Sequence, residues 1–283
     1  MNTVHHIDAL RDQLKQARQL QQRIALVPTM GNLHAGHISL IKRAREVADV
    51  VVASVFVNPL QFGPNEDYDS YPRTLEEDQR KLTEAGCDFL FAPSVKEMYP
   101  HGQHGVSKVQ VFGVSEGLCG GARPGHFDGV ATVVTKLFNI VQPDIAIFGQ
   151  KDYQQLAVIR AFVNDLNIPV EILSGDIVRD HDGLALSSRN AYLSADERAK
   201  APALYQVLSN AKAALQLGNE PANVLSQAVA ALIAAGFRLD YLELRDALTL
   251  QPAQADTRDA VLLAAAFMGT TRLLDNTTLT LPH

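Results

Sequence analysis

The histidine pair His34 and His37 lies in the segment VPTMGNLHAGH, which runs from Val27 to His37. A short apolar run precedes the pair and an amphipathic stretch follows it, which predicts that both imidazoles lie at the start of a helix. Free backbone N–H groups and the helix dipole favour anions there, and imidazoles add hydrogen-bond donors. The pattern favours a phosphate site, and a triphosphate would suit it. The alternative is that His34 only caps the helix and His37 lies on the surface. A zinc site is less favoured, because zinc usually takes at least three protein ligands.

A second polar segment, FGQKDYQQL, covers Phe148 to Leu156 and also follows an apolar run. Lys151 can act as a point charge on phosphates, Asp152 can accept hydrogen bonds from a ribose, and Gln155 can donate and accept. Alone, the segment is more typical of a polar helix start with a solvated Lys–Asp pair. Because both segments leave the carboxyl ends of predicted parallel strands, we expect them at one edge of a sheet.

A third segment, DGLALSSRN, covers Asp182 to Asn190. It presents two hydroxyls and a guanidinium in succession, from Ser187, Ser188 and Arg189. Such a loop could close over phosphates. Its alternative is an ordinary polar interdomain loop.

The segment FVNPLQFG, Phe56 to Gly63, supplies two uncharged amides, Asn58 and Gln61. These groups suit the hydroxyl and carboxylate of a hydroxy acid, although Asn-Pro also favours a turn by itself. Tyr71 and Arg73 follow as candidate rim residues, with a surface loop as an equal alternative. No GxGxxG follows the first predicted strand and no GxxxxGK[ST] is present, so dinucleotide oxidoreduction and P-loop chemistry lose ground.

Apolar runs that alternate with amphipathic stretches must position these residues. Continuous apolar strands separated by helices predict a parallel sheet covered on both faces, a doubly wound α/β domain whose ligand lies beyond the carboxyl ends of the strands. The predicted strands are Ile24–Pro28, Val50–Asn58, Asp88–Pro93 and Asp144–Gly149, and the predicted helices are His37–Ala48, Thr74–Gly86 and Phe127–Gln142. The Gly- and His-rich stretch 99–125 is predicted to form a loop.

A change in composition after about Gly175 predicts a second, smaller α+β domain. Its helices are expected at Ala195–Leu217 and Pro221–Ala235, and its strands at Arg238–Asp246 and Ala260–Met268. The predicted domains are residues 1–176 and 177–283.

The bulk composition points to a small ligand. The 283 residues carry a formal net charge of -6, which gives no basic footprint for nucleic acid. Two cysteines, Cys87 and Cys119, lack the spacing of a disulfide framework or zinc site and fit a reducing compartment. With neither a signal peptide nor an apolar run long enough to span a membrane, the expected location is the cytoplasm.

The motifs together resemble the pantothenate synthetase (pantoate–β-alanine ligase) family, part of the HxGH nucleotidyltransferase superfamily with its Rossmann-like domain. The resemblance covers at least Ile24 to Leu193 and rests on PTMGNLHAGH, NPLQFG, DYDSYPRT, RPGHFDGVATVV, FGQKDYQQL and DGLALSSRN in the family's order. Two positions depart from the family pattern, Ala35 and Gln150, where Glu is usual. They affect local charge balance and remove no residue with a direct catalytic role.

The resemblance implies ATP, pantoate and β-alanine as substrates, Mg²⁺ as the counter-ion of ATP without a dedicated metal site, and a homodimer through the N-terminal domain. Charge on the phosphates would be stabilised by His34, His37, Lys151, Ser187, Ser188 and Arg189, with His37 as the nominal acid. The nucleotide would be bound by Met30, Gly31, Asn32, Leu33, His34, Ala35, Gly36, His37, Gly149, Gln150, Lys151, Asp152, Val178, Leu186, Ser187, Ser188 and Arg189. Pantoate would be bound by Pro28, Met30, Gln61 and Gln155, with Gln61 also near β-alanine.

The implied reaction activates the pantoate carboxylate as an adenylate and passes the acyl group to β-alanine. Two other functions stay open on the sequence. One is a nucleotidyltransferase with a phosphorylated acceptor, whose pocket should contain Arg or Lys where this chain has Gln61 and Gln155. The other is a non-catalytic nucleotide sensor.

Overall fold

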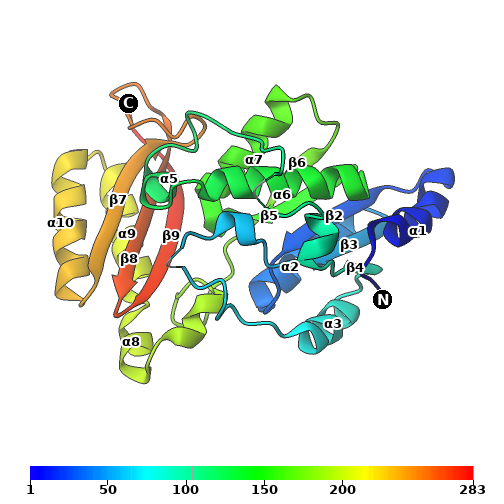
Figure 1. Cartoon of the computed structure of the whole chain (residues 1–283). Coiled ribbons are helices and arrows are strands. Elements are labelled where there is room, and N and C mark those ends of the chain that lie inside the picture. The colour runs from blue at the N-terminus through cyan, green and yellow to red at the C-terminus, as the bar shows by residue number, and fades with distance from the viewer. Residues whose placement is uncertain (65, 104, 283) are drawn as a thin grey trace. The chain divides into compact units, whose positions relative to one another are not determined.

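The computed structural model describes residues 1–64, 66–103 and 105–282, and the chain forms two compact units (Figure 1). The first unit contains Met1–Gln150 and Val158–Asp176. The second contains Lys151–Ala157 and the chain from Ile177 onward. The sequence predicts a single break after residue 176, whereas Lys151–Ala157 groups with the second unit.

The first unit is built on a six-stranded sheet in the order β1-β4-β3-β2-β5-β6, in which every pairing is parallel. The central strands are mainly apolar and are buried except at their carboxyl ends, as expected for a sheet covered on both faces. The strands are β1 (Asn2–Val4), β2 (Ile24–Thr29), β3 (Val50–Val55), β4 (Phe89–Phe91), β5 (Ile145–Gly149) and β6 (Glu171–Gly175).

Helices cover both faces of this sheet, with α2 and α3 on one side and α6 on the other (Figure 1). On α2, Leu40, Ile41 and Ala44 are spaced to share one face and pack against the strands. The helices of this part of the chain are α1 (Ile7–Gln19), α2 (Ala35–Val47), α3 (Leu75–Glu84), α4 (Val95–Met98), α5 (Leu118–Ala122), α6 (His126–Val141) and α7 (Tyr153–Asp165), with 3₁₀ turns η1 (Pro59–Gln61) and η2 (Gln150–Asp152).

The strand order reverses between β2 and β5, since β3 and β4 extend the sheet on one side of β2 and β5 and β6 extend it on the other. The registered pairs between β2 and β5 are Ala25 with Ile145 and Leu26 with Ala146. Both strands continue past these pairs, β2 to Thr29 and β5 to Gly149. Ligands of doubly wound sheets bind beyond the carboxyl ends of strands at such a reversal, so this edge is where a site is expected.

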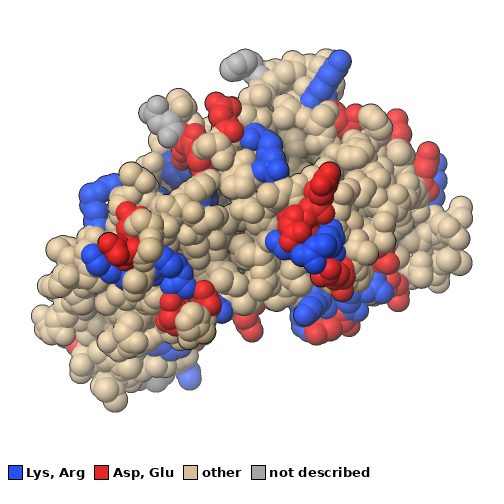
Figure 2. Space-filling view, turned by 90° about the horizontal axis from the view of Figure 1, so that it is seen from below, with Lys and Arg blue, Asp and Glu red and all other residues tan. Residues whose placement is uncertain are grey.

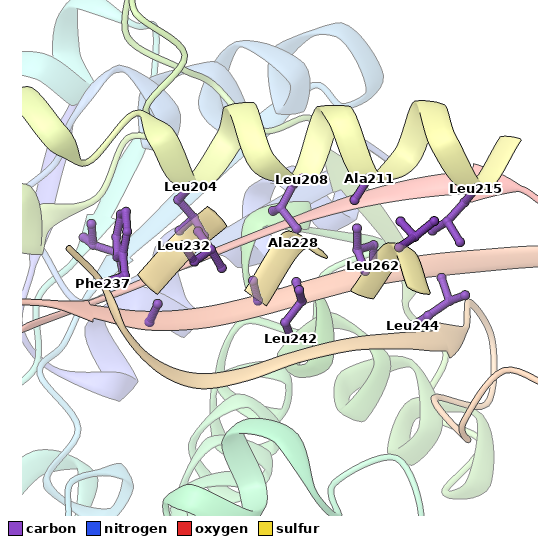
Figure 3. Packing of buried hydrophobic residues seen from close by; sticks show 14 of the residues in the cluster. Leu204, Leu208, Ala211, Leu215, Ala228, Leu232, Phe237, Leu242, Leu244 and Leu262 are labelled. Carbon is purple, nitrogen blue, oxygen red and sulfur yellow. The ribbon is translucent and has the colours of Figure 1, made fainter. Parts of the chain in front are cut away.

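The second unit packs helices on a three-stranded antiparallel sheet in the order β7-β8-β9. Figure 3 shows Leu204, Leu208 and Leu215 of α9 on the side of the helix that faces α10 and the sheet. Their spacing is that expected of a core-facing stripe. The elements are α8 (Ala195–Lys200), α9 (Ala203–Gln216), α10 (Pro221–Ala234), β7 (Arg238–Asp246), β8 (Asp259–Met268) and β9 (Thr271–Thr280), with the 3₁₀ turn η3 (Ser188–Tyr192).

The fold class expected from the sequence is confirmed, with three differences in detail. The predicted helix Ala195–Leu217 is two helices, because Pro202 has no N–H to continue the first. The predicted loop 99–125, of which His104 lies outside the described residues, contains α5. Strands β1, β6 and β9 and helices α1, α4 and α7 are additional to the expected elements.

Leu232 of α10 is fully buried in the core of the second unit. We expect Leu232→Ala to lower the free energy of unfolding by about 2–5 kcal/mol, from lost apolar transfer and the remaining cavity. Leu217→Ala is the matched control, since Leu217 is 82% exposed, and it should change the value by less than about 0.5 kcal/mol. Urea unfolding measures both, and equal unfolding midpoints for the two variants would contradict this packing.

Candidate active site

The two histidines of the first unit cap the helix that follows β2. His34 is the N-cap of α2, and its Nδ1 accepts a hydrogen bond from the backbone N–H of Gly36 at 3.1 Å. In return, the backbone N–H of His34 donates to Nδ1 of His37 at 3.3 Å. The ring centroids lie 4.1 Å apart. This reciprocal arrangement has the geometry of a capping box, with imidazoles in place of Ser and Glu.

These two hydrogen bonds fix the tautomer of each neutral ring. A backbone N–H can only donate, so Nδ1 of His34 and Nδ1 of His37 are both acceptors, and the ring proton is on Nε2. Each ring can therefore donate from Nε2 to an anion's oxygen. Helix capping and ligand binding, which are alternatives for His34 on the sequence, use different nitrogens of the ring and are compatible.

A buried carboxylate from α3 shapes the turn before the histidines. Asp78 is fully buried and accepts hydrogen bonds from the backbone N–H groups of Asn32 at 3.0 Å and Leu33 at 2.7 Å. Lys81, one turn later on α3, donates to the carbonyl of Leu33 at 2.7 Å. Gly31 adopts φ +85°, and a Cβ there would lie 3.0 Å from Val55 Cγ1, so glycine is required.

Sequence reasoning missed Asp78 because it stands in a run of charged residues. A signal was present, since Asp78 lies four positions before the buried Leu82 and so shares its face of α3. An acid on the apolar face of a helix needs internal donors, because burying an unpaired carboxylate is costly.

Gln61 lies at the end of η1 and is 8% exposed. Its Oε1 accepts from Asn58 Nδ2 at 3.1 Å, and its Nε2 donates to Met30 Sδ at 3.1 Å. Two residues that the sequence proposes for the pantoate site, Gln61 and Met30, are thus in direct contact. Met30 also lines part of a cavity of about 280 Å³ at the carboxyl edge of the sheet, together with Val55 and Phe56.

A charged network holds the main chain of Gln61. The carbonyl of Gln61 accepts from His126 Nδ1 at 2.8 Å and from Arg123 Nη2 at 3.4 Å, and Arg123 also faces His126 Nε2 at 3.0 Å. A guanidinium only donates, so Nε2 of His126 accepts and its proton is on Nδ1. Arg123 also forms a forked pair with Glu66 at 2.7 and 2.5 Å. Burial raises the pKa of Glu66, but the hydrogen bonds and charge of Arg123 outweigh it and hold that pKa below its usual value.

Of the other predicted binding residues, Lys151, Asp152, Gln155, Val178 and Leu186–Arg189 lie in the second unit, while Pro28, Gly149 and Gln150 lie in the first. Val178 and Leu186 are joined by a hydrogen bond from Leu186 N to the Val178 carbonyl at 2.9 Å, which closes a short hairpin. Ser187 then caps η3 by accepting from the backbone N–H of Arg189 at 3.3 Å. The sequence segment DGLALSSRN is therefore an ordered hairpin and turn that presents Leu186 to Arg189 together.

Lys151 is held by a residue that sequence reasoning missed. Asn276 of β9 is 2% exposed and donates from Nδ2 to the Lys151 carbonyl at 2.9 Å. Asp152 follows in η2, and Gln155 lies in the first turn of α7, half-buried. Pairing between residues so distant in the chain leaves no local sequence signal.

The chain offers little for covalent catalysis. Burial raises the pKa of the Cys87 thiol to about 12, which makes it a poor nucleophile. The segment Gly113–Gly117 reads GxSxG but lies in irregular structure, and its Ser115 hydroxyl donates to the Val111 carbonyl.

Among residues 1–64, 66–103 and 105–282, no group of three His, Cys, Asp or Glu side chains could hold a metal ion. No helix within those ranges is long and apolar enough to cross a membrane.

Charges of both signs mix on the surface. On the face drawn in Figure 2, Lys and Arg side chains lie beside Asp and Glu. On α3, for example, Arg80 contacts Glu77 at 2.7 Å and Glu84 at 2.6 Å. The hydrogen bond from Arg80 holds the pKa of Glu77 at about 2. Exposed pairs of this kind contribute little to stability.

Fold and site together define a doubly wound α/β protein with an imidazole pair at a helix N-terminus, beside the reversal of strand order. The sequence model described as Pantoate-beta-alanine ligase matches residues 2–278. The chain belongs to the pantoate–β-alanine ligase family.

The similarity to known relatives covers nearly the whole length of the chain. The chain is 63% identical to the pantothenate synthetase of Stutzerimonas stutzeri, over 98% of this chain and 97% of that protein. The crystal structure of pantothenate synthetase from Thermus thermophilus aligns with a TM-score of 0.92 and 48% identity, covering 98% of this chain and 99% of that one. The pantoate–β-alanine ligase of Francisella tularensis, complexed with β-γ ATP and β-alanine, aligns with a TM-score of 0.81 and 35% identity, over 98% and 97% of the two chains.

We expect Asp78→Asn to loosen the turn that leads into α2. The side chain keeps its size, but its NH₂ group would face the backbone N–H of Asn32 or Leu33, donor against donor. The free energy of unfolding should fall by about 1–3 kcal/mol. The control is Glu77→Gln on the same helix, which should leave the free energy of unfolding nearly unchanged because Glu77 is exposed and its ion pairs, with Arg80 and Lys81, are on the surface of α3. Chemical unfolding of both variants measures this. An equal fall in the free energy of unfolding for the two variants would show that the buried carboxylate does not stabilise the turn.

Proposed function

We propose that this chain joins pantoate and β-alanine to form pantothenate at the expense of ATP, through a pantoyl-adenylate intermediate, with release of pyrophosphate and AMP. The observation that carries the proposal is the capped imidazole pair, which offers two Nε2–H donors at a helix N-terminus beside the strand-order reversal. Family membership over residues 2–278 supports the same activity.

In the first step, a carboxylate oxygen of pantoate attacks the α-phosphorus of ATP and the bond to the bridging oxygen breaks, so pyrophosphate leaves with the electron pair. Negative charge grows on the phosphate oxygens, and donors fixed beforehand stabilise it. We assign this role to six side chains, with His37 as the nominal acid: His34, His37, Lys151, Ser187, Ser188 and Arg189.

In the second step, the free amine of β-alanine attacks the acyl carbon, AMP leaves, and the nitrogen loses a proton. A carboxylate and an amine do not condense unaided in water, and the adenylate supplies the missing leaving group. Positioning and electrostatics suffice for both steps, so no enzyme nucleophile is assigned. The buried thiol of Cys87 is consistent with this.

We assign the nucleotide to Met30–His37, Gly149–Asp152, Val178 and Leu186–Arg189. The supporting geometry within the first unit is the turn held by Asp78, and within the second it is the hairpin that joins Val178 to Leu186. Ala35 and Gln150 fall in this set and change only its charge. Pantoate is assigned to Pro28, Met30, Gln61 and Gln155, supported by the contact between Gln61 and Met30.

Mg²⁺ belongs to the proposal only as the counter-ion of ATP. The described residues form no cluster suited to a metal ion, so the nucleotide's own oxygens and water would supply its ligands, and no step is assigned to the metal. A homodimer and a cytoplasmic location complete the proposal. The first rests on resemblance to the family, and the second is supported by two unbridged cysteines.

The test is exchange of labelled pyrophosphate into ATP. We expect exchange that depends on pantoate and proceeds without β-alanine, because adenylation is reversible and precedes acyl transfer. Release of ADP and phosphate would instead mean attack at the γ-phosphate. Exchange that required a phosphorylated acceptor would indicate the alternative nucleotidyltransferase, and ATP binding without exchange would indicate a sensor.

His34→Asn separates capping from catalysis. Asn is a good N-cap, and its Oδ1 can replace Nδ1 of His34 in accepting from Gly36 N, but it lacks a group equivalent to Nε2. We expect a melting temperature near that of the wild type and a turnover number about ten- to a hundredfold lower, as for loss of a hydrogen bond to a charged group. His34→Ala, the comparison, should lose stability as well. Full turnover by a stable His34→Asn enzyme would leave His34 with capping alone.

A further inference from the structure

The hydroxyl of Tyr99 lies inside the first unit, next to η1. Tyr99 is 3% exposed and donates to Asn58 Oδ1 at 2.7 Å. Its ring packs near Phe56, with centroids 6.1 Å apart. Burial raises the pKa of Tyr99 above its usual value, so the hydroxyl keeps its proton and remains a donor.

The carboxamide of Asn58 has one favourable orientation. Its Oδ1 accepts from Tyr99 and from Leu60 N at 3.4 Å, while its Nδ2 donates to the Gly129 carbonyl at 3.1 Å and to Gln61 Oε1 at 3.1 Å. A flipped amide would put acceptor against acceptor at the Gly129 carbonyl and donor against donor at Leu60 N, so these two backbone groups set the orientation, and the Tyr99 hydroxyl then holds Oδ1 in place by donating to it. Gly129 allows this close approach, because a Cβ there would lie 2.3 Å from the Leu60 carbonyl oxygen.

The orientation of Asn58 determines that of Gln61. Since Asn58 offers an N–H, Gln61 must turn its oxygen toward Asn58 and its nitrogen toward Met30. The thioether sulfur is only a weak acceptor. The Gln61 amide therefore presents N–H groups at the place where the proposed function puts pantoate.

We propose that Tyr99 is a positioning residue that acts through Asn58 to hold the Gln61 amide nitrogen toward the bound acid, so that this position selects a ligand oxygen that accepts a hydrogen bond. The inference rests on the proposed function and adds that, in the contact between Gln61 and the acid, the protein donates and the ligand accepts. A carboxylate or hydroxyl oxygen fits this position. An ammonium group, which only donates, is rejected there, so the amine end of β-alanine does not bind at this position.

The first test compares Tyr99→Phe with Tyr205→Phe. Tyr99→Phe keeps the ring and removes the hydrogen bond that holds Asn58 Oδ1. Tyr205 of the second unit is the control, because within the described ranges its ring packs against Arg179 while its hydroxyl makes no hydrogen bond. We expect Tyr99→Phe to weaken pantoate binding about three- to tenfold in calorimetry, as for one lost neutral hydrogen bond, with ATP binding unchanged. Tyr205→Phe should bind both ligands as the wild type does. Unchanged pantoate affinity in Tyr99→Phe would overturn the inference.

A double-mutant cycle tests whether Tyr99 acts through Gln61. If it does, Tyr99→Phe should have little further effect on pantoate affinity in a Gln61→Ala background. Equal penalties in both backgrounds would mean that Tyr99 acts by another route and would refute the proposal. Asn58→Asp gives an independent test, because the carboxylate cannot donate to Gln61 Oε1 and favours the flipped amide. It should weaken pantoate binding more than Tyr99→Phe does, and equal or tighter binding would contradict the assigned polarity.

Failure of the proposed function can be recognised separately. If the wild-type enzyme shows no pantoate-dependent pyrophosphate exchange and no pantoate binding, the function is wrong and the polarity proposal is overturned with it. If the wild type binds pantoate and Tyr99→Phe binds it equally well, only the polarity proposal fails.

Discussion

The hydrogen bonds between the buried carboxylate of Asp78 and the peptide N–H groups of Asn32 and Leu33 are the interaction on which the site in the first unit depends. A carboxylate without solvent must find donors, and exposed peptide groups in a turn must find acceptors, so each requirement satisfies the other. The turn lies immediately before His34, and its shape determines where α2 begins. The donors offered to an anion are therefore fixed by a residue that is itself inaccessible.

The same logic of complementary hydrogen bonding recurs around Gln61. Its side chain is oriented by Asn58, and its carbonyl is held by Arg123 and His126. Each partner has its own orientation set by a group with only one possible role, such as a guanidinium or a backbone N–H. Linked hydrogen bonds of this kind leave the side chains few alternative orientations. A site that is preorganised in this way needs less reordering when a ligand binds.

Much of the fold follows from apolar periodicity, and the failures have physical reasons. The central strands β2, β3 and β5 are continuous apolar runs and were readable as such. At the edges, β1 has three residues and β6 consists of exposed and half-buried positions, so neither gives a continuous buried run. The split of the predicted helix at Pro202 was visible in the sequence, since proline removes the required N–H.

The candidate site was predictable where chemistry is concentrated in short segments, as at His34 and His37. It was not predictable where a residue acts by tertiary contact. Asp78, Tyr99 and Asn276 bond groups that lie 45, 41 and 125 positions away in the chain, and no local pattern records such pairings. The tautomers of the histidines also required the structure, because they depend on which backbone groups face each ring.

The link from Asp78 to Leu33 also determines when the site forms during folding. The α2 cap is local, since its two hydrogen bonds join residues two and three positions apart. The turn before it is closed by a contact across 45 residues, and such contacts are delayed by the entropy of loop closure. A nascent chain that has emerged only as far as α2 can form the helix start, but the finished anion site waits for α3 to be synthesised and to dock.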